Sequence, residues 1–129
     1  MLIQVDLLRS LVADIFAKAG CSPEESERIA RHLASANLTG HDSHGVIRVP
    51  RYVSWLESGN LRAGQNLTII SETDLITVVD GNRGFGQTIG EQAVQLGINK
   101  ALRSGISIVA LRQSGHLGRI GDWAEMAIE

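Results

Sequence analysis

Twelve consecutive residues, from His41 to Tyr52, hold an unusual density of groups that could do chemistry together. They include two imidazoles, a hydroxyl, a carboxylate, two guanidiniums and a phenol. The stretch follows an apolar helical segment that ends near Gly40, where the backbone leaves the helix and can direct side chains into a cleft. We interpret this stretch as half of an active site.

Within this stretch, His44 and Arg48 are the pair that a purely structural role explains least. They are four residues apart and would share one face if the chain is helical there. An imidazole can exchange a proton, and a guanidinium can bind a carboxylate through two parallel hydrogen bonds. Asp42 and Ser43 could instead cap the next helix, which is the structural alternative for those two residues.

Two other chemistries have less support in the same stretch. His41 and His44 are three apart and could share a metal ion, but no nearby glutamate or cysteine completes a ligand set, so we expect no metal. Ser43 beside His44 suggests a hydrolase. The G-x-S-x-G motif is absent, however, and neighbouring residues rarely face each other as a nucleophile and its base must.

A second glycine-rich segment, Ser114 to Trp123, follows a predicted buried strand. This order places His116 at the carboxyl end of a strand, where α/β proteins gather their ligands. The glycines at 115, 118 and 121 would let a backbone approach a bound molecule closely. Taken alone, the segment is explained better by a strand-to-helix turn with His116 facing water.

A third segment, Gly84 to Gly90, resembles a dinucleotide fingerprint only in part. Its third glycine falls one residue late for G-x-G-x-x-G. The next strand is closed by Arg112 instead of an acidic residue, and an arginine there could accept a 2′-phosphate. Turn and helix-start chemistry is the favoured interpretation.

The composition excludes several classes of protein. A chain of 129 residues with 43% apolar content can form a core, and a net charge of −2 with scattered basic residues disfavours nucleic-acid binding. No apolar run approaches the roughly 20 residues that span a bilayer, and the start lacks a secretion signal, so we expect a cytoplasmic protein without membrane contact. Cys21 is the only cysteine, which excludes an internal disulfide and leaves an incidental loop thiol.

Helical periodicity dominates the first sixty or so residues. One helix covers residues 7–16 and stops at Gly20. A second begins after Ser22, which supplies a capping hydroxyl, with a proline at the first helical position and Glu25 three residues after the cap. A third runs from Arg51 to Ser58. Residues 1–62 therefore form a helical region with the substrate-site loop.

The pattern then changes to β-rich runs. Residues 67–70 and 75–79 suit a hairpin, a helix follows Gly86, and residues 106–111 read as a strand buried on both faces. Strand, helix and strand in that order predict a βαβ unit, so residues 63–129 begin a mixed-sheet α/β domain. The last helix lacks a stop signal and the sheet lacks cover on both faces, so we expect a truncated piece.

These segments together resemble the malate/L-lactate dehydrogenase family, which is distinct from the Rossmann lactate dehydrogenases. The resemblance is carried by ANLTGHDSHG at residues 36–45, Arg48 and Tyr52, residues 80–87, and SGHLGRIGDWAE at residues 114–125. It covers essentially the whole chain and only the N-terminal part of the family. It implies a three-layer mixed-sheet domain beside a helical region, and a homodimer.

The resemblance also implies a reaction and roles. The family transfers a hydride between NAD or NADP and a small 2-hydroxy or 2-oxo acid, which requires a proton donor and a cation for the carboxylate. His44 and His116 become the candidate acid/base groups, with the choice between them open, and Arg48 the carboxylate clamp. Ser43 and Tyr52 would position the substrate.

Cofactor contacts within this chain are expected at Gly118 and Arg119, and most others beyond residue 129. The alternative function is a catalytically silent fragment or dimerisation module of such an enzyme. The resemblance fits NAD and NADP equally, and it fits malate, lactate, sulfolactate and ureidoglycolate as substrates equally.

Overall fold

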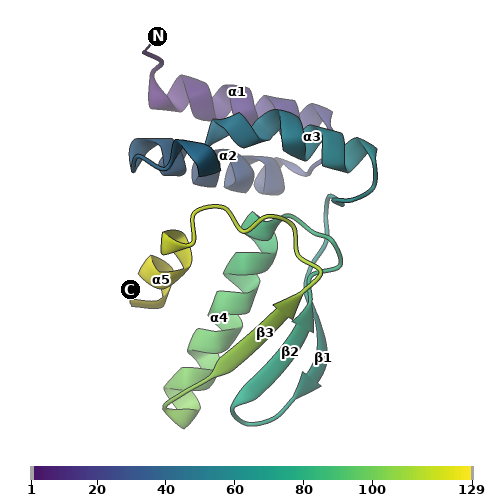
Figure 1. Ribbon diagram of the computed structural model, residues 1–129, viewed down its shortest axis with the longest axis vertical. Helices are drawn as coiled ribbons and strands as arrows, with labels where there is room; N and C mark the ends of the chain where they lie inside the picture. The colour runs from purple at the N-terminus through teal and green to yellow at the C-terminus, as the bar shows by residue number, and fades with distance from the viewer. Residues whose placement is uncertain (1, 129) are drawn as a thin grey trace. The chain divides into compact units, whose positions relative to one another are not determined.

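The computed structural model describes residues 2–128, and the chain divides into two compact units after Gly64 (Figure 1). The first unit is helical, and the second combines helices with a mixed sheet. The chain is therefore α/β with a helical N-terminal region, as predicted.

Three helices make up the first unit: α1 (Val5–Lys18), α2 (Pro23–Leu38) and α3 (Val49–Glu57). Phe16 of α1 and Tyr52 of α3 are fully buried, and their ring centroids are 6.3 Å apart. Ile29 and Leu33 of α2 contribute fully buried aliphatic side chains. These positions recur at helical spacing, which is why the periodicity predicted this region well.

The start of α2 is fixed by the predicted cap. The Ser22 hydroxyl accepts the backbone N–H of Glu25 at 3.2 Å, and Pro23 occupies the first helical position. The Glu25 carboxylate accepts the N–H of Gly64 at 2.7 Å. Cys21 is buried next to this helix start, and burial, followed by the nearby Glu25 carboxylate, raises the pKa of its thiol to about 12.

In the second unit, β1 (Thr68–Glu72) pairs antiparallel with β2 (Ile76–Asp80), which confirms the predicted hairpin. Helix α4 (Gly86–Ser104) then crosses to β3 (Ile108–Arg112), which runs parallel to β2. The predicted βαβ unit is thus present, in a sheet of order β1-β2-β3. Helix α5 (Gly121–Ile128) follows the glycine-rich segment.

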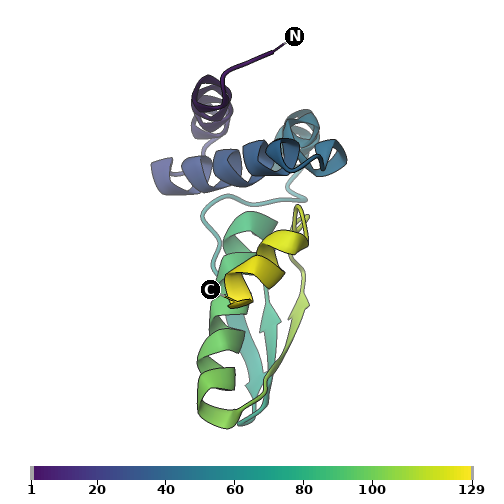
Figure 2. The same cartoon turned by 90° about the vertical axis from the view of Figure 1, so that its left-hand side faces the viewer.

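One face of this sheet is covered and the other is bare. Helices α4 and α5 lie over the same face (Figure 2), where Thr77 and Val79 of β2 are fully buried. On the opposite face Ile76 and Ile108 are 45% and 56% exposed. The prediction that β3 is buried on both faces is therefore wrong for residues 2–128, because helices within that range cover a single face.

The expected third layer does not lie within residues 2–128, where the second unit has one helical layer and one sheet. None of the helices in this range has the length and apolar character needed to cross a membrane.

Candidate active site

The segment after α2 is wound into two short 3₁₀ turns, Asp42–His44 and Val46–Arg48, separated by Gly45. The second turn leads directly into α3. The prediction that His44 and Arg48 share one face assumed a continuous helix, and the extended backbone at Gly45 interrupts it. His44 and Arg48 instead each contact Ser43.

Ser43 contacts both His44 and Arg48. Its hydroxyl oxygen lies 2.9 Å from Nδ1 of His44, and its backbone carbonyl accepts a hydrogen bond from Nε of Arg48 at 2.6 Å. Neighbouring residues were expected not to face each other, but the tight 3₁₀ turn makes this contact. Ser43, His44 and Arg48 therefore form one cluster within the first unit.

This cluster has the parts needed to bind an anion and move a proton. Because a hydroxyl can donate or accept, the Ser43 side chain can satisfy Nδ1 of His44 in either protonation state. In the part of the chain that the structure describes, no carboxylate pairs with Arg48. Its fork of donors is suited to a small carboxylate ligand.

Asn37, which the sequence argument passed over, holds this loop in place. Its side-chain N–H donates to Asp42 Oδ1 at 2.6 Å, and its Oδ1 accepts the backbone N–H of Val46 at 2.9 Å. The only sequence signal was an asparagine in the last turn of a helix, followed eight residues later by Gly45.

Tyr52 and His41 make other contacts within the first unit. The Tyr52 ring is buried in the helical core and stacks on Trp55 at 6.0 Å, so its predicted role in positioning the substrate stays a prediction. Nδ1 of His41 lies 3.0 Å from the Thr39 carbonyl, to which it can donate. No group of three His, Cys, Asp or Glu residues suited to a metal ion occurs between residues 2 and 128.

His116 is held by backbone in the second unit. Its Nδ1 accepts the N–H of Gly118 at 3.2 Å, which is made possible by the left-handed φ of +71° at Gly118. A neutral imidazole that accepts at Nδ1 carries its proton on Nε2. In the same segment, the indole N–H of Trp123 donates to the Leu117 carbonyl at 3.1 Å and ties the loop to α5.

His44 lies in the first unit and His116 in the second. Each group is defined by contacts within its own unit. Their predicted convergence around a single anion stays a prediction.

Comparison with known proteins identifies the family. The family model described as malate/L-lactate dehydrogenase matches residues 3–129. The chain belongs to the malate/L-lactate dehydrogenase family. The resemblance drawn from the sequence is thereby confirmed.

Individual members of the malate/L-lactate dehydrogenase family match nearly all of this chain. It is 42% identical over 118 residues to hydroxycarboxylate dehydrogenase B of Escherichia coli (strain K12), covering 92% of this chain and 33% of that protein. It is 33% identical over 128 residues to L-sulfolactate dehydrogenase of Methanocaldococcus jannaschii, covering 99% and 37%.

Among solved structures, malate dehydrogenase from Pyrococcus horikoshii OT3 matches with a TM-score of 0.93 and 35% identity, over 98% of this chain and 36% of that one. The chain thus spans about a third of the length of these relatives.

Membership of the malate/L-lactate dehydrogenase family implies a nicotinamide cofactor, so we tested whether glycines in this chain could cradle its phosphates. A Cβ at Gly86 would lie 2.1 Å from the carbonyl oxygen of His116, and one at Gly90 would lie 2.6 Å from the ring of Trp123. These glycines allow close packing within the unit. This supports the turn and helix-start interpretation over a dinucleotide fingerprint.

The arginines nearby are also engaged. Nε of Arg112 pairs with Asp80 at 2.9 Å, and Arg119 pairs with Asp122 and Glu125, each at 2.6 Å. The hydrogen bond to Glu125, followed by the one to Asp122, raises the pKa of Arg119 further above its ordinary value.

Between residues 2 and 128 we therefore find no built pyrophosphate cradle. The predicted cofactor contacts of Gly118 and Arg119 stay predictions. A phosphate at Arg119 would compete with two carboxylates.

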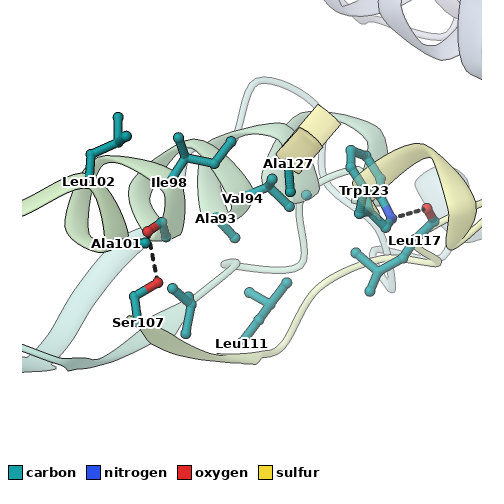
Figure 3. A pocket seen from close by; sticks show the side chains of 13 residues that line it. Ala93, Val94, Ile98, Ala101, Leu102, Ser107, Leu111, Leu117, Trp123 and Ala127 are labelled. Atoms are coloured by element: carbon teal, nitrogen blue, oxygen red, sulfur yellow. Dashed lines mark hydrogen bonds between the residues drawn. The ribbon is translucent and has the colours of Figure 1, made fainter. Parts of the chain in front are cut away.

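A cavity of about 570 Å³ opens between α4, β3 and α5 (Figure 3). Its lining is almost wholly apolar and includes Val94, Ile98, Leu111 and Trp123. It contains no acidic or basic side chain, so it does not coincide with either histidine group.

Proposed function

We propose that this chain supplies the substrate-binding and proton-transfer side of a nicotinamide-dependent 2-hydroxyacid dehydrogenase. Such an enzyme delivers a hydride to the carbonyl carbon of a 2-oxo acid while a proton reaches the carbonyl oxygen, and it runs the reverse reaction on the hydroxy acid. The names of the relatives support this class of substrate.

The single observation that carries the proposal is the contact of Ser43 with both His44 and Arg48. A 2-oxo acid has a carboxylate next to its reactive carbonyl, so one small loop must present a cation and a proton donor close together. Arg48 would bind the carboxylate, and His44 would exchange the proton. Ser43 would orient the imidazole through its contact with Nδ1.

The partners of the two histidines support different roles for them. The Ser43 hydroxyl can reverse its hydrogen bond, so it tolerates both the neutral and the charged form of His44. The Gly118 N–H can only donate, so it favours the neutral form of His116 with its proton on Nε2. We assign proton transfer to His44 and a fixed hydrogen bond to the substrate oxygen to His116.

The remaining expectations belong to the same proposal. The hydride comes from NAD(H) or NADP(H), which supplies the two electrons, and Gly118 and Arg119 lie near its site. Tyr52 helps to position the substrate, and the enzyme acts as a cytoplasmic homodimer. The family membership supports a nicotinamide cofactor without distinguishing the two dinucleotides.

The test is a spectrophotometric assay on the protein at its full natural length. NADH and NADPH are each mixed with pyruvate, oxaloacetate, sulfopyruvate and related 2-oxo acids, and loss of nicotinamide absorbance is followed. We expect turnover with at least one pair, and its loss in His44→Ala and His116→Ala. Turnover unaffected by both substitutions would remove these histidines from the mechanism. No turnover with any acid would overturn the proposed function.

A further inference from the structure

The side chain of Asn37 is hydrogen-bonded to both sides of the loop that carries Ser43 and His44. The bond to Asp42 lies just before these two residues and the bond to the N–H of Val46 lies just after them. The amide uses a donor at one end and an acceptor at the other. It therefore closes the loop onto the last turn of α2.

Gly45 shows how closely the loop is held against this amide. A Cβ at Gly45 would lie 2.1 Å from Oδ1 of Asn37 and 2.5 Å from its Cγ. The φ of Gly45 is −88°, so its backbone conformation does not itself require glycine. The close approach of the Asn37 side chain is what excludes a larger residue.

The two anchored positions, Asp42 and Val46, bracket Ser43 and His44, and Arg48 follows in the second turn. Between them, the Ser43 hydroxyl meets Nδ1 of His44, and the Ser43 carbonyl receives the Arg48 guanidinium. All three side chains lie on two short turns without long-range strand or helix pairing of their own. Their relative positions therefore depend on what holds the ends of the loop.

We propose that Asn37 is a positioning residue for the reaction: its amide fixes the loop so that His44 and Arg48 contact the same substrate anion. This inference rests on the proposed function. Only an amide serves both contacts, because a carboxylate at this position would face the Asp42 carboxylate and an aliphatic side chain would lose both bonds.

The test exchanges the two bonded side chains. In Asn37→Asp, two carboxylates face each other across what was a 2.6 Å hydrogen bond, and we expect kcat to fall about 10- to 100-fold, as small misplacements of catalytic groups do. In the double variant Asn37→Asp with Asp42→Asn the amide donates from the other side, so kcat should return to within about threefold of the parent. Asp42→Asn alone keeps an acceptor oxygen for Asn37 and serves as the matched control.

Measurements of KM and of the melting temperature distinguish a positioning role from a general loss of structure. We expect the melting temperature to change little in Asn37→Asp, with a larger loss in kcat than in KM. Equal kcat in Asn37→Asp and the parent would overturn the proposal. So would failure of the double variant to recover at an unchanged melting temperature.

A measurement that does not depend on turnover distinguishes failure of this inference from failure of the proposed function. In Asn37→Ala we expect faster hydrogen exchange at the Val46 amide and shifted ring nitrogen signals of His44, with the Thr39 amide, bonded to Ser35 within α2, unchanged. If the parent protein turns over no 2-oxo acid, the proposed function fails. The positioning role then stands or falls on whether the His44 signals move.

Discussion

The two histidines assigned to the site are held by different kinds of partner. His44 is held by a side-chain hydroxyl, in a loop that another side chain, Asn37, closes. His116 is held by a backbone N–H, in a loop pressed against the backbone of Gly86. The first arrangement can change its hydrogen-bond direction, and the second cannot.

This difference suggests a division of labour. A group that gains and loses a proton in each cycle needs a neighbour that accommodates both states, which a hydroxyl does. A group that only polarises a carbonyl works best when its donor is already oriented, because no reorganisation is then needed during the reaction. The comparison also implies that side-chain substitutions should perturb the loop that carries His44. An added Cβ next to the backbone should perturb the loop that carries His116.

The largest expected effect is the loss of kcat when His44 is replaced by glutamine, and the same substitution at His116 tests whether the two histidines have different roles. Glutamine can donate a hydrogen bond but cannot shuttle a proton, so His44→Gln should lower kcat by about 10²- to 10⁴-fold. His116→Gln keeps a donor and should lower kcat by only about 10-fold. Steady-state kinetics of both variants at one pH would check this. The reverse order of effects would exchange the two roles.

A second substitution tests the Ser43 hydroxyl, which can either donate to Nδ1 of His44 or accept from it. Ser43→Ala removes the hydroxyl but keeps the backbone carbonyl that receives Arg48, so we expect a loss of about 10-fold in kcat with little change in KM. Ser54→Ala, on α3 and exposed, is the matched control and should be silent. A loss confined to KM would indicate that Ser43 binds substrate instead of orienting His44.

The backbone contact behind His116 can be tested by adding one methyl group. Gly86→Ala would push a Cβ to 2.1 Å from the His116 carbonyl oxygen, and we expect the free energy of unfolding to fall by about 1–3 kcal/mol. Gly97→Ala, in the same helix, meets the side-chain ends of Val109 at 3.3 Å and Ser107 at 3.5 Å and gains helix propensity, so it should be close to neutral. Urea unfolding followed by Trp123 emission measures both, and equal stability of the two variants would contradict the packing argument.

The last prediction concerns the dependence of stability on pH and a residue of the first unit, Cys21. Because the folded-state pKa of Cys21 is raised to about 12, its thiol keeps a proton that the unfolded chain releases above about pH 9. The free energy of unfolding should therefore fall as pH rises through this range, with a slope of up to about 1.4 kcal/mol per pH unit from this group. Cys21→Ala should lose that part of the slope in alkaline urea titrations. An unchanged slope would show that the thiol is not protected by the fold.

The sequence predicted those features that depend on local chemistry. The Ser22 cap, the helical periodicity around Phe16 and the strand–helix–strand order follow from residues close together in the chain. The burial of β3 was predicted wrongly because it depends on what covers the second face, which the residues of the strand do not specify.

In the candidate site, the sequence indicated residue types but not their contacts. His44, Arg48 and Ser43 were proposed from their chemistry, but the contact of Ser43 with His44 arises from a 3₁₀ turn that the pattern did not indicate. Asn37 was missed because its partners depend on how the loop returns to the helix. The predicted meeting of His44 with His116 is untested, since it depends on how two separate units are arranged.

The account is tested most directly by locating the proton on each histidine ring. Two-bond proton–nitrogen correlation spectra of the protein, recorded with ¹⁵N-labelled histidine above neutral pH, distinguish the two neutral tautomers. We predict that His116 carries its proton on Nε2, with Nδ1 unprotonated and bonded to the Gly118 N–H. A proton on Nδ1 of His116 would contradict the account, because the fixed backbone donor would then have no acceptor.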